Sequence, residues 1–276
     1  MSLIKLGFME GKKLFSQREI YIALFLCTVL FVMGLDAIGE PDVPLLFWRK
    51  LADVIPYVGF WFIAILIVVG VARCLPFEQE QGMSELLLTY KKGRLTLLVV
   101  KQIVILMYCV SIVLYFYGIA VFVFTMDYDL TGLFAQVKEN PNLYFYANLE
   151  WTYAELMIYE FGYIVLASYI FALFIVLLSL FIKRSVFIMM IGGSIFAAGE
   201  LFDKFIIKYI GTMELGYYLT TIYDYMFNGM LSFRYLNYFG PFSTNEVYGL
   251  FLFIAFLLFG MNLFLGRWQR HVAMGD

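Results

Sequence analysis

Long apolar runs alternate with short charged or polar segments over the whole chain. Six of these runs are long enough to cross a hydrocarbon layer of about 30 Å as helices of roughly 20 residues. They cover residues 20–38, 54–72, 95–125, 156–182, 185–202 and 247–265. Only Lys183 and Arg184 separate the fourth run from the fifth, which predicts an antiparallel helical hairpin. The pattern predicts an all-α integral membrane protein with six transmembrane helices in one domain, residues 1–276.

The segment before the first span, residues 1–19, is amphipathic. Most of its apolar side chains lie on one side of a helical wheel: Leu3, Ile4, Phe8, Leu14 and Phe15. Its basic residues suit the anionic headgroups of a membrane surface: Lys5, Lys12, Lys13 and Arg18. We therefore expect an interfacial helix lying flat on the membrane, and no cleavable signal peptide before the first span.

Three further segments lie between the spans. Residues 36–53 are rich in acid and contain Pro41 and Pro44, which predicts a loop. Residues 126–155 are polar and rich in tyrosine, and residues 203–246 contain apolar pieces too short or too interrupted to span. We expect both of these long segments on the outer side of the membrane, the second with re-entrant or interfacial helices.

Basic residues are distributed unequally between the two sides of the predicted bundle. Twelve lie on one side: Lys5, Lys12, Lys13, Arg18, Arg73, Lys91, Lys92, Arg94, Lys183, Arg184, Arg267 and Arg270. Six lie on the other, in longer loops: Arg49, Lys50, Lys138, Lys204, Lys208 and Arg234. By the positive-inside rule the first side is cytoplasmic, so both termini are expected inside a cell membrane, which we take to be a bacterial plasma membrane.

Composition and motifs exclude several classes of function. Hydrophobic residues make up 63% of the chain and charged residues 14%, and 19 basic against 21 acidic residues give no reason to expect nucleic acid. The sequence holds a single histidine, His271, and no CxxC or HExxH, so no metal site is expected. It also lacks GxxxxGK[ST] and GxSxG. We therefore expect no catalytic residues and no cofactor on this chain.

Two acidic residues lie at or inside the spans. Glu160 is early in the fourth span and Glu200 is late in the fifth. Ionisable groups are costly in hydrocarbon and usually face a bundle interior or a polar cavity, so both are candidates for a substrate pathway. An interfacial or ion-paired carboxylate is an equally open reading. Small residues in the fifth span, from Gly192 to Gly199, predict close helix packing.

The most charged break in the apolar pattern is residues 77–94, FEQEQGMSELLLTYKKGR. Acids come first, leucines follow, and basic residues end the segment. That order suits a short amphipathic helix along the membrane plane, with acids near its positive N-terminal end. An ordinary charged loop fits the local pattern as well.

The run from Glu78 to Tyr90, followed by Gly93, Arg94 and Lys101, resembles the segment after the second span in permeases of type-2 ABC exporters, which reads approximately E-x-E-x-G-T-x-E-x-L-L-x-x-P. The six-span layout and the amphipathic N-terminal segment are also similar to that family. Met83 and Lys91 depart from the pattern, at its threonine and proline positions. The resemblance implies a coupling helix that binds an ATPase subunit through Glu78, Glu80, Gly82, Glu85, Leu86, Leu87 and Tyr90.

The resemblance further implies the membrane subunit of an ATP-driven exporter. ATP and Mg would bind a separate nucleotide-binding subunit, and a second permease chain, identical or related, would complete the pathway. The aromatic, weakly charged spans favour an amphipathic or hydrophobic substrate such as a peptide, drug or lipid. Two alternatives stay open: an ion-coupled secondary carrier that uses Glu160 and Glu200, and a non-transporting immunity or sensory subunit.

Overall fold

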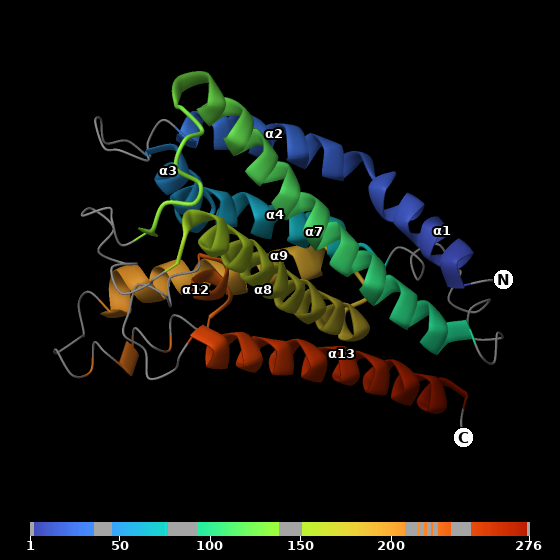
Figure 1. The fold of residues 1–276 in the computed structure, drawn as a ribbon. Coiled ribbons are helices and arrows are strands. Elements are labelled where there is room, and N and C mark those ends of the chain that lie inside the picture. The colour runs from blue at the N-terminus through green and yellow to red at the C-terminus, as the bar shows by residue number, and fades with distance from the viewer. Residues whose placement is uncertain are drawn as a thin grey trace.

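The computed structural model describes residues 3–35, 46–74, 76, 93–137, 151–207, 226–232 and 244–274, and four isolated positions, 215, 218, 219 and 222. Its named elements are all helical (Figure 1). They are α1 (Leu3–Phe15), α2 (Arg18–Leu35), α3 (Leu46–Val54), the π-helix η1 (Ile55–Gly59), α4 (Phe60–Val71), α7 (Gly93–Asp127), α8 (Tyr153–Phe181), α9 (Ser185–Leu201), the π-helix η3 (Phe202–Ile207), α12 (Phe227–Leu231) and α13 (Thr244–Met274).

Five helical stretches within the described residues are long and apolar enough to cross a membrane. They are Arg18–Leu35, Phe47–Val71, Leu95–Asp127, Tyr153–Phe181 and Glu246–Trp268. The predicted helical membrane protein is therefore confirmed. The predicted fifth span forms the apolar helix α9, but its 17 residues reach only about 25 Å at a rise of 1.5 Å per residue. The count of six spans accordingly remains a prediction.

The loop predicted over residues 36–53 is wrong in its second half. Residues 46–54 form α3, which continues through η1 into α4, so the second span begins about two turns earlier than predicted. The charged residues of α3 have partners: Lys50 Nζ donates to Tyr128 Oη beyond the end of α7 at 2.7 Å, and Arg49 lies 4.0 Å from Asp53, one turn further along α3. Pro56 lies at the start of η1, where its missing N–H is accommodated by the wider π-turn.

The boundaries of the other spans follow the predictions more closely. A capping box formed by Thr152 and Glu155 starts α8, and three residues separate its end from Ser185, as expected for the hairpin. The last helix is longer than predicted, since α13 runs from Thr244 to Met274. Within residues 203–246 the described part includes α12, whose Met230 and Leu231 are buried.

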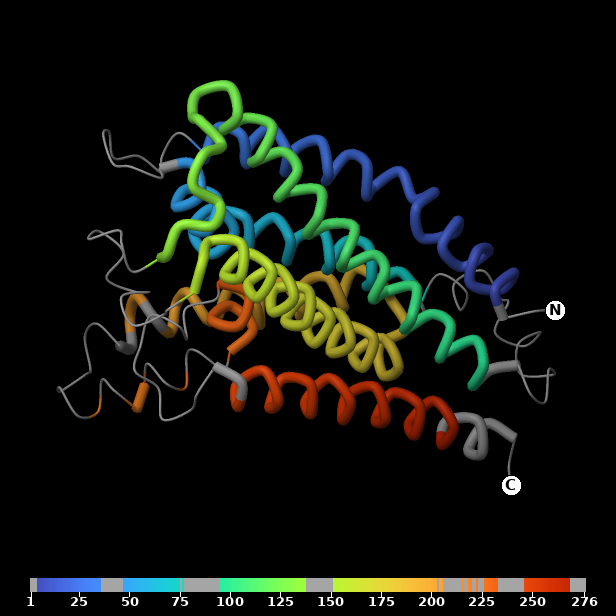
Figure 2. Tube along the Cα trace, in the orientation of Figure 1, coloured from blue at the N-terminus to red at the C-terminus, as the bar shows by residue number. Residues whose placement is uncertain are grey.

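The central helix of the bundle is α8, which packs against α4, α7, α9, α12 and α13 (Figure 2). Phe171 of α8 contacts the rings of Phe196 and Phe227. A Cβ on Gly192 would contact Ile175, and one on Gly199 would lie 2.5 Å from Asn228 Cβ. These two positions agree with the close packing predicted for this span, whereas a Cβ on Gly193 would meet nothing within 4 Å.

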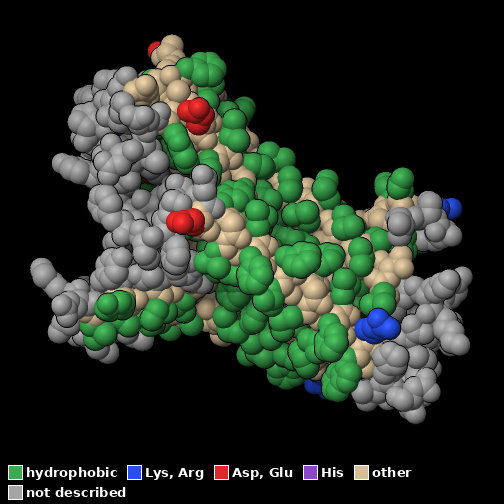
Figure 3. All heavy atoms as spheres, turned by 60° about the horizontal axis from the view of Figure 1, so that its bottom comes forward, with side chains coloured by type: hydrophobic (Ala, Val, Ile, Leu, Met, Phe, Trp, Pro, Cys, Tyr) green, Lys and Arg blue, Asp and Glu red, His purple; other side chains and the backbone are tan. Residues whose placement is uncertain are grey.

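The helices α2 and α13 lie at the edges of the bundle. Only 22% of the residues in the most apolar 18-residue stretch of each helix are buried, against 56–67% for the other three spans. Figure 3 shows hydrophobic side chains covering the middle of one face, with visible acidic groups toward one end and basic groups toward the other. We call the end that holds α1, the start of α7, the α8–α9 joint and the end of α13 the basic end; both termini lie there (Figure 1).

Candidate functional site

The segment with the predicted partner contacts lies largely outside the described residues. Residues 77–92 are not described, and they include all seven predicted contacts, Glu78, Glu80, Gly82, Glu85, Leu86, Leu87 and Tyr90. The structure does describe both flanks of the segment. Cys74 follows the C-terminal end of α4, and α7 begins at Gly93. The candidate site is therefore built from these flanks and the helix that packs beside them, α1.

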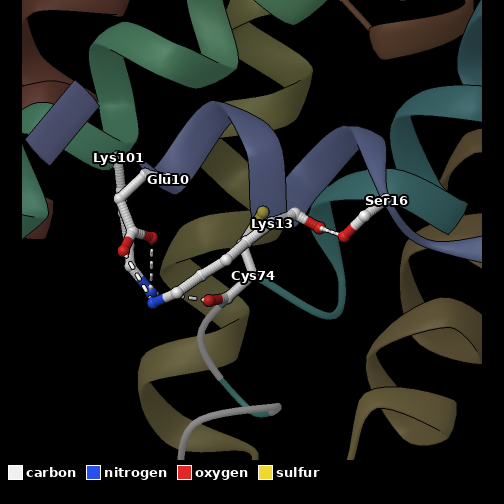
Figure 4. Close-up of polar contacts among 5 residues, drawn as sticks. All are labelled: Glu10, Lys13, Ser16, Cys74 and Lys101. Atoms are coloured by element: carbon white, nitrogen blue, oxygen red, sulfur yellow. Dashed lines mark hydrogen bonds and ion pairs between the residues drawn. The ribbon is translucent and has the colours of Figure 1, made fainter. Parts of the chain in front are cut away.

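Lys101 joins the two flanks to α1 (Figure 4). Its Nζ donates to the carbonyl oxygen of Cys74 at 2.7 Å and lies 3.6 Å from Glu10 Oε2. Lys13 Nζ donates to the other carboxylate oxygen of Glu10 at 2.8 Å. Three parts of the chain thus meet at one buried ammonium group. We call these four residues, Glu10, Lys13, Cys74 and Lys101, the basal junction.

Lysines near the start of a span often reach the membrane interface, whereas Lys101 is buried between helices. Lys101 is only 5% exposed and Glu10 only 7%. A buried ammonium is tolerated when its donors are bonded, and the carbonyl groups at a helix C-terminus lack partners in their own helix. The Cys74 carbonyl and the Glu10 carboxylate supply those acceptors. Lys101 therefore points into the basal junction.

A second ion pair joins α2 to the end of the second span. Arg73 pairs with Glu19, which follows the first residue of α2. Both side chains are partly exposed, so this pair alone contributes little free energy. Together with the basal junction, it connects the α1–α2 region to residues 73 and 74 at two places.

Apolar packing holds α1 against the bundle. Leu14 is 2% exposed, and the ring of Phe15 meets that of Tyr108 edge-on at 5.7 Å. Ile4 and Phe8 are 86% and 75% exposed, so the apolar face predicted by the helical wheel is divided between bundle and surroundings. The reason is that Glu10 and Leu14 share a face, which is turned to α7. The exposed part suits the predicted contact with a membrane.

Sequence reasoning did not single out Glu10. It is an acid on a helix whose other charged residues are basic, and this contrast was the available signal. Tyr108 was also missed. Its hydroxyl donates to Leu66 O at 2.8 Å, and its ring lies against Gly70, where a side chain would displace it.

Glu160 is completely buried in the contact between α7 and α8. Its Oε1 accepts a hydrogen bond from Tyr117 Oη at 2.8 Å. Its Oε2 is buried and has no hydrogen-bond partner among the described residues. A buried carboxylate oxygen without a hydrogen-bond donor destabilises the fold. Packing alone therefore does not explain an acidic residue at this position.

Glu200 has a different environment. It forms an ion pair of 2.9 Å with Lys204, one helical turn further on, and is partly exposed. The two acids considered as a pair therefore have separate partners, and the part of the chain that is described contains no contact between them. Their role in a substrate pathway remains a prediction.

A cavity of about 280 Å³ adjoins the basal junction at the bend between α1 and α2. We call it the elbow cavity; it is lined by Glu10, Lys13, Leu14, Ser16, Gln17, Arg18, Glu19, Arg73 and Cys74. Although Glu10, Glu19 and Cys74 line it, no three His, Cys, Asp or Glu side chains in the described ranges are grouped to hold a metal ion.

No protein-family model matches this chain, and neither does any curated protein.

Proposed function

We propose that the chain is the membrane-spanning permease subunit of an ATP-driven exporter of the type-2 ABC class. It would work with a separate ATPase subunit and a second permease chain. The observation that carries the proposal is the basal junction, in which Lys101 ties both flanks of residues 77–92 to α1. Force applied to this segment by a partner would thus reach three helices together.

The length of α7 supports transmission across the bundle. Its 35 residues span about 50 Å at a rise of 1.5 Å per residue. Lys101 lies near one end of the helix, and Tyr117, about 24 Å further along, bonds Glu160 on α8. A movement of α7 would act directly on this buried carboxylate. Rigid-body displacement of packed helices is a common means of such coupling.

The surface and charge distribution support the proposed setting. The described parts of the predicted cytoplasmic segments lie at the basic end, where α1 exposes Ile4 and Phe8. The apolar faces of α2 and α13 suit lipid or a second permease chain. We infer a cargo that is amphipathic or hydrophobic, with Glu160 as the candidate contact for a polar group on it.

Co-expression with an ATPase encoded beside this chain, recognised by GxxxxGK[ST], tests the proposal. Glu85→Arg should leave membrane insertion unchanged and abolish co-purification of the ATPase. Asp129→Arg is the matched control, because it reverses an exposed acid beyond the far end of α7. Co-purification and ATP hydrolysis at the unmodified level in Glu85→Arg would overturn the assignment.

Glu160 also supports the second candidate function, an ion-coupled carrier. A buried carboxylate with one unpaired oxygen is a typical proton-binding group in transporters. In proteoliposomes without any ATPase, an imposed proton gradient would then drive cargo movement that Glu160→Gln removes. Gradient-independent transport that requires the ATPase would favour the exporter, and ATPase binding without any transport would favour the non-transporting subunit.

A further inference from the structure

Charged side chains of both signs line the elbow cavity. Glu19 is paired with Arg73, and Glu10 is paired with Lys13 and with Lys101, which lies behind the lining. Arg18 is a further basic residue of this lining. Arg18 is exposed, and no hydrogen bond or ion pair of its side chain is found among the described residues.

The lining also holds an acceptor without a donor. The Oε1 atom of Gln17 is buried and has no hydrogen-bond partner within the described part of the chain. An orphaned buried oxygen in a polar cavity indicates a missing donor, from water or from a ligand. The cavity thus offers cationic donors, Arg18 among them, and beside them one acceptor for a hydroxyl or ammonium group.

The position of the cavity identifies the kind of molecule that would reach it. On one side α1 exposes Ile4 and Phe8, and on the other α2 continues as an apolar span with most of its surface uncovered. A bend between an interfacial helix and a membrane-spanning helix lies at the level of the lipid headgroups. The most abundant anion at that level is the lipid phosphate.

We propose that the elbow cavity binds the headgroup phosphate of one glycerophospholipid from the adjacent leaflet. Arg18, Arg73 and Lys13 would donate to the phosphate, and Gln17 Oε1 would accept from the hydroxyl or ammonium group of the headgroup. The bound lipid would stabilise the bend next to the basal junction. This proposal does not depend on the exporter assignment, because it requires neither an ATPase nor a cargo.

Native mass spectrometry of the full chain in detergent, titrated with phosphatidylglycerol, measures this binding. The unmodified protein should retain one lipid per chain. Arg18→Gln removes a cationic donor, and Gln17→Glu places a negative charge in the cavity without changing its size. Each should weaken retention about tenfold, the scale of one hydrogen bond to a charged group. Lys12→Gln, an exposed charge of α1 outside the lining, is the control and should change it by less than about threefold.

Two further ligands test whether the cavity recognises the phosphate of a lipid, and not the acyl chains alone or a free phosphate ion. Diacylglycerol with the same chains lacks the phosphate and should not be retained, and inorganic phosphate should not displace the lipid. Equal weakening by Lys12→Gln and Arg18→Gln would indicate diffuse attraction and overturn the proposal. Retention of diacylglycerol as strong as that of phosphatidylglycerol would do the same, as would displacement by inorganic phosphate. Gel filtration checks that each variant is folded before titration.

Discussion

The ammonium group of Lys101 lies 2.7 Å from the carbonyl oxygen of Cys74, 27 residues earlier in the chain. This hydrogen bond joins α7 to the residue that follows the end of the second span. The nearby carboxylate of Glu10 links α1 to the same ammonium group. The flanks of residues 77–92 cannot separate, and α1 cannot leave α7, without exposing or stranding a buried charge.

Lys101→Met should destabilise the protein by about 2–4 kcal/mol, because it strands the Cys74 carbonyl and removes one partner of Glu10. Lys13 still neutralises Glu10, which keeps the loss below that of a fully isolated charge. The free energy of unfolding in mixed micelles measures the effect. The exposed Lys12→Met is the control and should stay within about 0.5 kcal/mol. A loss in Lys101→Met as small as in this control would show that the junction does not stabilise the fold.

The coupling between Lys101 and Glu10 can be measured separately. A double-mutant cycle with Lys101→Met and Glu10→Gln should give an interaction energy of about 1–3 kcal/mol, as expected for residues that share one network. The cycle of Lys101→Met with Asp129→Asn, at the opposite end, should give a value near zero. Equal coupling energies in the two cycles would contradict the assigned ion pair.

Gly70→Ala should destabilise the chain by about 1–3 kcal/mol through overpacking. A Cβ at this position would lie 2.7 Å from Tyr108 Cζ, so the ring that contacts Phe15 of α1 must move. Gly118→Ala on α7 is the matched control, because a Cβ there meets nothing within 4 Å. Alanine is a better helix former, so the control should be neutral or stabilising by up to about 1 kcal/mol. Identical thermal shifts for both variants would refute this packing.

Tyr117→Phe should destabilise the protein by about 1–3 kcal/mol, because it removes the hydrogen bond to Glu160 and leaves a buried carboxyl group unpaired. Tyr115→Phe provides the comparison. It removes an exposed hydroxyl contact with Thr28 of 2.9 Å and should cost less than about 1 kcal/mol. Combining Tyr117→Phe with Glu160→Leu should recover part of the lost stability. No recovery would mean that the carboxyl group is satisfied by another partner.

The topology can be tested with a membrane-impermeant maleimide, in a background where Cys27, Cys74 and Cys109 are replaced by alanine. Phe134→Cys, at a position 78% exposed beyond the end of α7, should be labelled from outside intact spheroplasts. Lys12→Cys on α1 should be labelled only after lysis. Labelling of both positions from the same side would overturn the proposed orientation.

Most of the membrane-spanning architecture was predictable from hydropathy, because burial in lipid imposes a local requirement on every residue of a span. The packing at Gly192 and Gly199 was also predictable, because small side chains permit close approach of helices, but the neighbouring Gly193 shows that the sequence does not tell which small residues face a partner.

The errors concern charges whose partners are distant in the chain. Lys50, in the segment predicted to be a loop, is 78 residues from the Tyr128 hydroxyl that it contacts. The burial of Lys101 was not predictable, because hydropathy accounts for the cost of burying a lysine but not for acceptors at Cys74 and Glu10. Neither the basal junction nor the elbow cavity could be inferred until the tertiary structure had brought α1 beside the start of α7.

The central claim is that residues 77–92 contact an ATPase subunit. A photoreactive benzoylphenylalanine in place of Leu87, in membranes that contain both proteins, should cross-link to the ATPase, and the same residue in place of Phe134 should not. We predict cross-linking at position 87 that weakens in Glu85→Arg. An absence of cross-linking at position 87, with the ATPase nevertheless bound and active, would contradict it.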